Sequence, residues 1–120
     1  MSGQSLTSGK IQFSLVYSLG GSWAGKEVVI RALPNKLNSS RFGFVVSRRV
    51  GKAVVRNRIK RLLREIVRHT PVKPGWDIVF IARIPAAASG FADLDKTVGK
   101  LLFRAGLCVG ENEENSPGVN

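Results

Sequence analysis

The chain has 120 residues, 19 of them Lys or Arg and 8 Asp or Glu, which gives a formal net charge of +11 and an isoelectric point near 11.0. This length predicts one domain with its own core, and this charge is typical of proteins that bind polyanions. No apolar run approaches the roughly 18 residues of a membrane-spanning helix, no signal-peptide core is present, and one cysteine excludes an internal disulfide. We therefore expect a monomeric, cytoplasmic domain in a reducing compartment.

The N-terminal segment is predicted to contain a short helix. The first residues, 1–7, are small and polar, and we expect them to be flexible. The helix begins near Ser8 and ends near Leu19. Within it, Phe13 and Tyr17 are four residues apart and share one face. Such a pair usually packs into a core, and the alternative is a stacking platform for unpaired bases.

Two stretches of alternating apolar residues follow the first helix. The range Trp23–Leu33 predicts one strand, and a second strand begins at Arg41 after a loop. In the second strand, Phe42, Phe44 and Val46 alternate with other residues, which predicts one well-buried face. We expect these two strands to be antiparallel neighbours.

An amphipathic helix is predicted from about Val54 to His69, because the apolar residues now repeat with a helical period and Pro71 disfavours further helix. Its apolar stripe comprises Val55, Ile59, Leu62, Leu63 and Ile66. The polar side chains of this helix and of the turn before it are almost all cationic. Arg58 lies on a flank of the polar arc, and Arg56 lies near its apolar edge. The full set is Arg48, Arg49, Lys52, Arg56, Asn57, Arg58, Lys60, Arg61, Arg64 and Arg68.

This cationic face lacks counter-charges of its own. Glu65 is the one acid in the stretch, and the spacing pairs it with Arg61 at i, i+4. A phosphate backbone supplies the missing negative charge, and arginine forks match phosphate oxygens in geometry. The stretch therefore predicts a surface that binds nucleic acid.

The remaining part of the chain predicts a strand and a last helix. The range Trp76–Ala82 is a continuous apolar run, which is typical of a strand buried on both faces. With the preceding strand and the basic helix it forms a βαβ unit, for which a right-handed crossover is the default. Ser89 is the expected N-cap of a helix over Phe91–Ala105. Residues 108–120 are expected to be a flexible acidic tail.

The chain shows no recognisable catalytic or metal-binding set. His69 is the one histidine and lies at the end of the basic helix, where it contacts carbonyls or is exposed. One Cys and one His cannot form a zinc site, and the carboxylates outside the tail form no tight motif. The sequence also lacks a phosphate-binding glycine loop. We expect a binding protein with no catalytic and no metal-ligating residues of its own.

The string SRRVGKAVVRNRIKRLLRE, residues 47–65, resembles the signature of the bacterial ribonuclease P protein subunit. RFGFVVS before it, GWDIVFIARIPAA after it and LLFRAGL near the end are also similar, so the resemblance spans roughly residues 8–107. It implies a single compact α+β domain over those residues, with element order α-β-β(-β)-α-β-α and a fold like the second domain of ribosomal protein S5. It also implies a left-handed βαβ crossover, against the default.

The resemblance further implies partners and site residues. The family's protein pairs one-to-one with a catalytic RNA, which uses Mg²⁺ to remove the 5′ leader from precursor tRNA. The protein binds that RNA and the single-stranded leader, and it strengthens substrate and metal binding. By position, the RNA-binding residues are Arg48, Arg49, Lys52, Arg56, Asn57, Arg58, Lys60, Arg61, Arg64 and Arg68. The leader-binding cleft comprises Phe13, Tyr17, Phe44 and Val46, which gives the aromatic pair a binding role instead of a core role.

Two features depart from the family pattern. Lys10 is the one basic residue before Phe13, and the uncharged residues 18–21 follow Tyr17 where basic residues are usual, which predicts weaker electrostatics on the leader side. The acidic tail is absent from the pattern. From the residues alone, two other classes stay open: a ribosomal or general RNA-binding protein, and a DNA-binding regulator that places the basic helix in a major groove.

Overall fold

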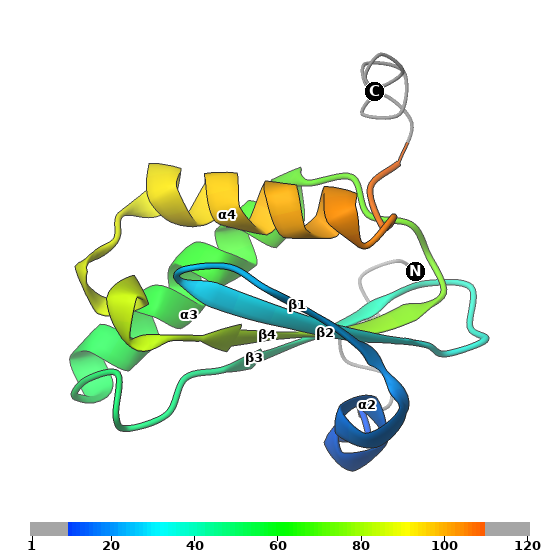
Figure 1. The fold of residues 1–120 in the computed structure, drawn as a ribbon, viewed down its shortest axis with the longest axis horizontal. Coiled ribbons are helices and arrows are strands. Elements are labelled where there is room, and N and C mark those ends of the chain that lie inside the picture. Colours follow the sequence, from blue (N-terminus) through cyan, green and yellow to red (C-terminus); the bar gives the residue numbers. More distant parts are fainter. Residues whose placement is uncertain (1–9, 110–120) are drawn as a thin grey trace.

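The computed structural model describes residues 10–109, so the expected flexible segment at residues 1–7 and all but the first two residues of the expected tail at 108–120 lie outside the described residues. The described elements, in chain order, are α2 (Phe13–Leu19), β1 (Gly21–Ala24), β2 (Val28–Pro34), β3 (Arg41–Val45), α3 (Ala53–His69), β4 (Trp76–Ala82), the 3₁₀ helix η1 (Ile84–Ala88) and α4 (Phe91–Arg104). Figure 1 shows these elements arranged as an α+β domain. In this part of the chain no helix is long and apolar enough to cross a membrane.

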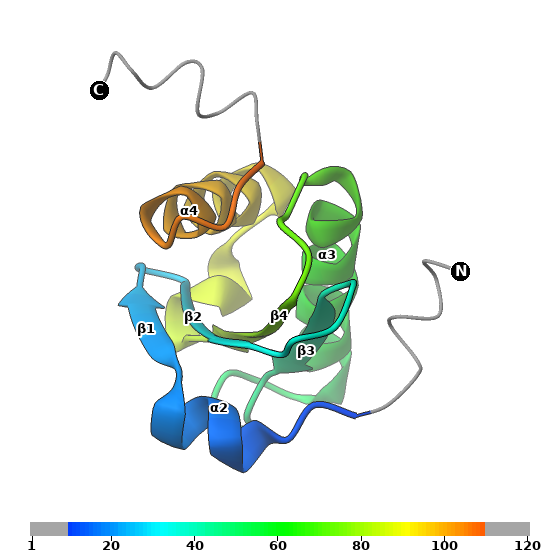
Figure 2. The same cartoon turned by 90° about the vertical axis from the view of Figure 1, so that its right-hand side faces the viewer.

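The sheet separates two layers of helices. Figure 2 shows α3 and α4 on one face and α2 on the other. The core lies between the sheet and the α3–α4 layer, where Phe80, Ile30, Leu63 and Leu94 have no exposed surface. The α3–α4 face of the sheet is therefore the core face, and the α2 face is covered by one short helix.

The helix α3 confirms the predicted amphipathic helix. It spans Ala53–His69, and its fully packed residues include Ile59, Leu63 and Ile66, each at most 1% exposed. Leu62, at the margin of the apolar stripe, is partly buried. Because the helical period is 3.6 residues, burying this stripe leaves the opposite arc in solvent.

The strand order is β1-β2-β4-β3, which corrects one predicted neighbour relation. We expected the strand before the loop and the strand at Arg41 to pair, but β4 lies between them. β4 pairs antiparallel with β2 and parallel with β3, with Phe80 opposite Ile30 on one side and Phe44 on the other. A strand that is apolar on both faces is best buried at the centre of the sheet, and this preference displaces β3 to the edge.

The segment predicted as one strand over Trp23–Leu33 is a hairpin of two strands. β1 and β2 pair antiparallel, and the Gly25 amide donates to the Val28 carbonyl at 2.8 Å to close the turn. The first helix is also shorter than predicted, because α2 begins at Phe13 after Gln12. The expected start at Ser8 lies outside the described residues.

The last helix begins one residue later than its predicted cap. Gly90 is the N-cap of α4, whereas the hydroxyl of Ser89 donates to the Pro85 carbonyl at 3.0 Å. Gly106, at φ +74°, ends the helix in the left-handed conformation. Cys108, which we assigned to the tail, is buried and forms a β-bridge with Val72. The ordered core therefore extends beyond the end of α4, because Cys108 pairs with the segment that connects α3 to β4.

Candidate nucleic-acid interface

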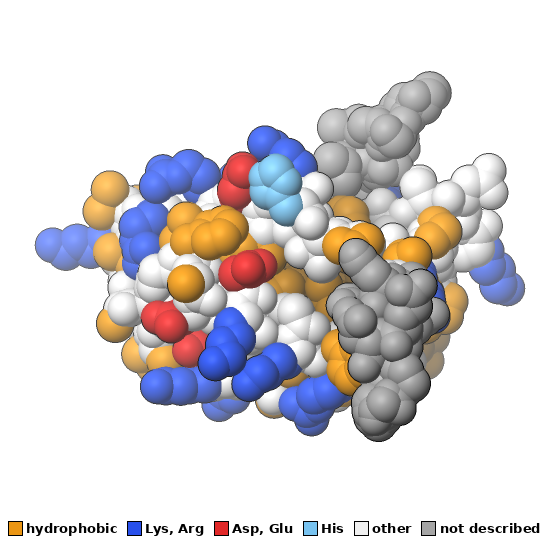
Figure 3. Space-filling view, turned by 90° about the horizontal axis from the view of Figure 1, so that it is seen from above, with side chains coloured by type: hydrophobic (Ala, Val, Ile, Leu, Met, Phe, Trp, Pro, Cys, Tyr) orange, Lys and Arg blue, Asp and Glu red, His pale blue; other side chains and the backbone are white. Residues whose placement is uncertain are grey.

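The exposed face of α3 carries the predicted cationic side chains. Asn57, Arg61, Arg64 and Arg68 are exposed, and Lys60 is half-buried at the edge. Figure 3, in which the upper side of Figure 1 faces the viewer, shows basic side chains interspersed with acidic ones. The helix α4, at the top of Figure 1, carries Asp93 and Asp95 among its cations, whereas α3 has one acid in its whole length. The α3 face is therefore the surface where positive charge is least balanced.

The turn before α3 adds further cations to this face. Arg48, Arg49 and Lys52 are exposed, while Val50 between them is buried and anchors the turn. The turn closes through backbone hydrogen bonds, in which the Val50 amide donates to the Ser47 carbonyl at 3.1 Å. The first turn of α3 contains no acidic residue, and no side chain caps its N-terminus. Its free amides and the helix dipole therefore favour an anion at this end.

Two arginines of the predicted set have internal partners. Arg58 is half-buried, and its guanidinium donates to the carbonyls of Ala87 at 3.0 Å and Ser89 at 3.2 Å. Arg56 donates from Nε to the carbonyl of Gly51 at 3.1 Å. Arg58 therefore ties α3 to the end of η1, and Arg56 ties the helix to its own entry turn. The guanidinium of Arg58 is engaged within the fold, so its position in the motif does not make it part of the exposed surface.

The predicted Arg61–Glu65 pair is wrong. Glu65 instead accepts from Arg68 at 3.4 Å and contacts His69 at 2.8 Å, one turn further along the helix. Both partners of Glu65 lie in the last turn of α3, where basic residues also compensate the helix dipole. Among residues 10–109, Arg61 and Arg64 form no ion pair with a carboxylate. These two guanidiniums are therefore free to contact an external anion.

The aromatic pair of α2 is exposed. Phe13 and Tyr17 are 38% and 40% exposed, with ring centroids 6.3 Å apart, while Val16 at 1% is the residue that α2 buries. The guanidinium of Arg31 lies 5.5 Å from the centroid of the Tyr17 ring and donates to the Tyr17 carbonyl at 2.6 Å. The core role inferred from spacing alone is wrong, and α2 presents a surface of two rings and one cation.

The predicted leader-binding cleft is divided by the sheet. Phe13 lies on the α2 face, where a Cβ on Gly43 would be 2.9 Å from its ring. Successive residues of a strand point to opposite faces, so Phe44 lies on the core face, stacked on Phe80 at 5.5 Å. Val46 is 7% exposed and belongs to the core cluster. Phe44 and Val46 therefore do not share a surface with Phe13 and Tyr17, which corrects the prediction.

Other residues of the sheet lie on the α2 face. Val45 is opposite Ile81, and Ile81 is opposite Val29, so that a cross-strand row of half-buried apolar side chains lies on this face. We did not predict this row. The alternation of β3 contained the signal, because placing Phe44 in the core requires Val45 to point to the opposite face.

A polar cluster occupies the other end of the α2 face. Arg41 donates to Asp77 through Nε at 2.8 Å and Nη2 at 2.7 Å, and Asn35 donates to the same carboxylate at 2.9 Å. Burial alone would raise the pKa of Asp77, but the hydrogen bonds from Arg41 and Asn35 outweigh it and hold the pKa below its usual range. The carboxylate is fully engaged within the fold and has a structural role. Within residues 10–109 no group of three His, Cys, Asp or Glu side chains could hold a metal ion.

Known proteins resemble this chain in sequence and in fold. A model of the ribonuclease P family matches residues 4–106. The ribonuclease P protein component of a Dehalococcoides mccartyi strain is 48% identical over 105 residues, 88% of each chain, and that of Clostridioides difficile is 44% identical over 100 residues, 81% of this chain and 88% of the other. The solved ribonuclease P protein of Staphylococcus aureus has a TM-score of 0.75 at 31% identity, covering 83% of this chain and 95% of its own. That of Thermotoga maritima has a TM-score of 0.71 at 34% identity, covering 78% and 90%. The chain belongs to the ribonuclease P protein family.

Proposed function

We propose that this chain is the protein component of ribonuclease P, an endoribonuclease that assembles with an RNA subunit and removes the 5′ leader from precursor tRNA. The observation that carries the proposal is the exposed face of α3, where Arg61 and Arg64 have no carboxylate partner among the described residues. Membership of the ribonuclease P family supports the choice of RNA over DNA. The RNA subunit supplies catalysis and holds the Mg²⁺ ions, and the protein acts in the cytoplasm.

In this proposal the two sides of the sheet bind different RNAs. The turn at residues 48–52 and the outer face of α3 contact the RNA subunit, because a phosphate backbone neutralises their unbalanced charge. The α2 face binds the single-stranded leader. Phe13 and Tyr17 offer rings for base stacking there, and Arg31 beside Tyr17 adds a cation for the backbone. Arg58 stabilises the fold and is left out of the RNA contacts.

The proposal predicts the outcome of a reconstitution experiment. Precursor tRNA cleavage is measured at low Mg²⁺ with this protein alone, with bacterial ribonuclease P RNA alone and with both. Correct 5′ processing that is strong in the mixture and absent with the protein alone is the expected result. A folded protein that gives no enhancement, yet protects ribosomal RNA at physiological salt, would instead assign it to general RNA binding.

A further inference from the structure

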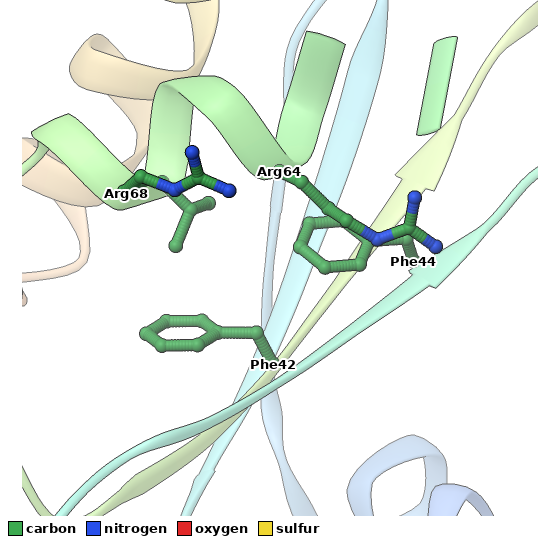
Figure 4. Close-up of a pocket in the computed structure, with 5 residues that line it drawn as sticks. Phe42, Phe44, Arg64 and Arg68 are labelled. Atoms are coloured by element: carbon green, nitrogen blue, oxygen red, sulfur yellow. The ribbon is translucent and has the colours of Figure 1, made fainter. Parts of the chain in front are cut away.

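A groove on the core side of the edge strand adjoins the exposed face of α3, and its aromatic lining is not used by either proposed surface. It is lined by Phe42, Phe44, Arg64, Val67 and Arg68 and has a volume of about 370 Å³. Figure 4 shows the side chains of Arg64 and Arg68 extending from α3 on the same side of β3 as the rings of Phe42 and Phe44. This volume lies within the range of about 300–1,000 Å³ that is typical of small-ligand sites.

The groove combines an aromatic floor with a cationic rim. Phe42 and Phe44 each pack one side against Phe80 of the core, with centroid distances of 6.4 Å and 5.5 Å. The guanidinium of Arg64 lies 5.7 Å from the centroid of the Phe44 ring and is thereby held over the groove. Because the core fixes both rings from behind, they form a rigid floor. The guanidinium of Arg64 already lies over the Phe44 ring, so Phe42 is the ring that a flat ligand can contact without displacing Arg64.

An unpaired nucleotide is the ligand whose chemistry fits both parts of the groove. Single-stranded RNA is recognised by stacking of splayed bases on aromatic rings and arginine planes, and its phosphates suit guanidinium forks. A helical duplex does not fit, because its bases are already stacked on one another. The groove also continues directly from the exposed face of α3, since Arg64 and Arg68 belong to both.

The main alternative occupant is the chain's own C-terminal segment. Residues 110–120 contain Glu111, Glu113 and Glu114, which could pair with the arginines, but they contain no aromatic residue and one valine. Such a segment would satisfy the rim and leave the aromatic floor exposed to water. Arg68 already donates to Glu65 at 3.4 Å. A nucleotide can contact both parts of the groove, with its phosphate at the arginine rim and its base on the aromatic floor.

We propose that the Phe42–Arg68 groove binds one unpaired nucleotide of the RNA subunit, with the base against the Phe42 ring and its phosphate at Arg64 and Arg68. This inference rests on the proposed function, and it adds a base-stacking site on the face of the sheet opposite the leader. The stacking part is independent of charge, whereas the arginine contacts are charge-dependent. The two parts are therefore separable by the salt dependence of binding.

The first measurement is the affinity for ribonuclease P RNA at several salt concentrations. Phe42→Leu removes the ring but keeps an apolar side chain, and Phe103→Leu is the matched control at an exposed phenylalanine of α4. We expect Phe42→Leu to weaken binding roughly tenfold with an unchanged salt slope, because one stacked base is lost and no phosphate contact. Phe42→Tyr should retain full affinity, and the melting temperatures of all variants show whether they are folded.

The second measurement locates the occupant directly. Phe42→p-benzoylphenylalanine is photo-crosslinked in the complex with ribonuclease P RNA, with Val54→p-benzoylphenylalanine on exposed α3 as a positive control. A crosslink from position 42 to an unpaired RNA nucleotide supports the groove site. A crosslink to residues 110–120, or an RNA crosslink from position 54 alone, overturns it.

The outcomes separate this inference from the proposed function. If the wild-type protein neither binds ribonuclease P RNA nor enhances cleavage, the proposed function fails. If it does both, and folded Phe42→Leu binds as tightly as Phe103→Leu, the groove site alone is refuted.

Discussion

Arg58 provides the sharpest test of how the basic helix is divided between folding and binding. Arg58→Met keeps the apolar stem and the helix propensity but removes two hydrogen bonds, to Ala87 and Ser89. Hydrogen bonds from a charged donor each contribute about 1.5–3 kcal/mol, and water replaces part of that at a half-buried site. We expect the free energy of unfolding to fall by about 2 kcal/mol, which lowers the melting temperature by roughly 8–10 °C for a domain of this size.

The matched variant is Arg61→Met, three residues along the same helix. Arg61 is exposed and has no ion pair among the described residues, so its replacement should change stability by less than about 0.5 kcal/mol. For Arg61→Met, the magnitude of the slope of log binding constant against log salt concentration should decrease by about 0.7–0.9, the value for one lost phosphate contact. For Arg58→Met this slope should be unchanged. Thermal unfolding and salt-dependent binding are measured on both. The reverse pattern, a stable Arg58→Met with a shallower slope, would refute the structural role.

Three further predictions follow from burial, charge and the α2 face. Leu63→Ala should lower the free energy of unfolding by about 2–5 kcal/mol in denaturant titration, because Leu63 is fully buried, and a normal midpoint would contradict its place in the core. The lowered pKa of Asp77 means that its pairing with Arg41 stabilises the fold fully above pH of about 4 and is lost as the pH falls through the folded pKa. Acid titrations of stability should therefore be flatter for Asp77→Asn than for wild type, and identical curves would exclude this linkage. Tyr17→Ala should weaken binding of precursor tRNA several-fold but leave mature tRNA unaffected, and equal losses for both would argue against a leader site.

Local patterns in the sequence were sufficient for α3 and for the family. The helix is encoded by residues three and four apart, so its apolar stripe and cationic arc can be phased without any long-range contact. The same holds for the end of the helix before Pro71 and for the buried strand Trp76–Ala82, which the structure reproduces. The similarity to ribonuclease P proteins was also visible in short strings, because the motif lies within the turn and the helix.

The partners of individual side chains were not local, and several predictions about them were wrong. Arg58 donates to carbonyls 29 and 31 residues away, so its helical position could not show that it is engaged. Glu65 has possible partners at both i−4 and i+4, and spacing alone did not select between Arg61 and His69. These choices depend on side-chain packing and on the field at the helix end.

The sequence by itself therefore determined which segments form the basic helix and the central strand, and to which family the chain belongs. The tertiary structure alone decided which face each strand residue occupies. Once β4 takes the centre of the sheet, β3 becomes an edge strand with Phe44 in the core layer and Val45 beside α2. The alternation of a strand has period two, so it defines two faces but does not show which of them packs against which helix layer. The packing of α2 over Gly43 decides which face lies against α2, and it places Phe13 and Tyr17 on the opposite side of the sheet from Phe44.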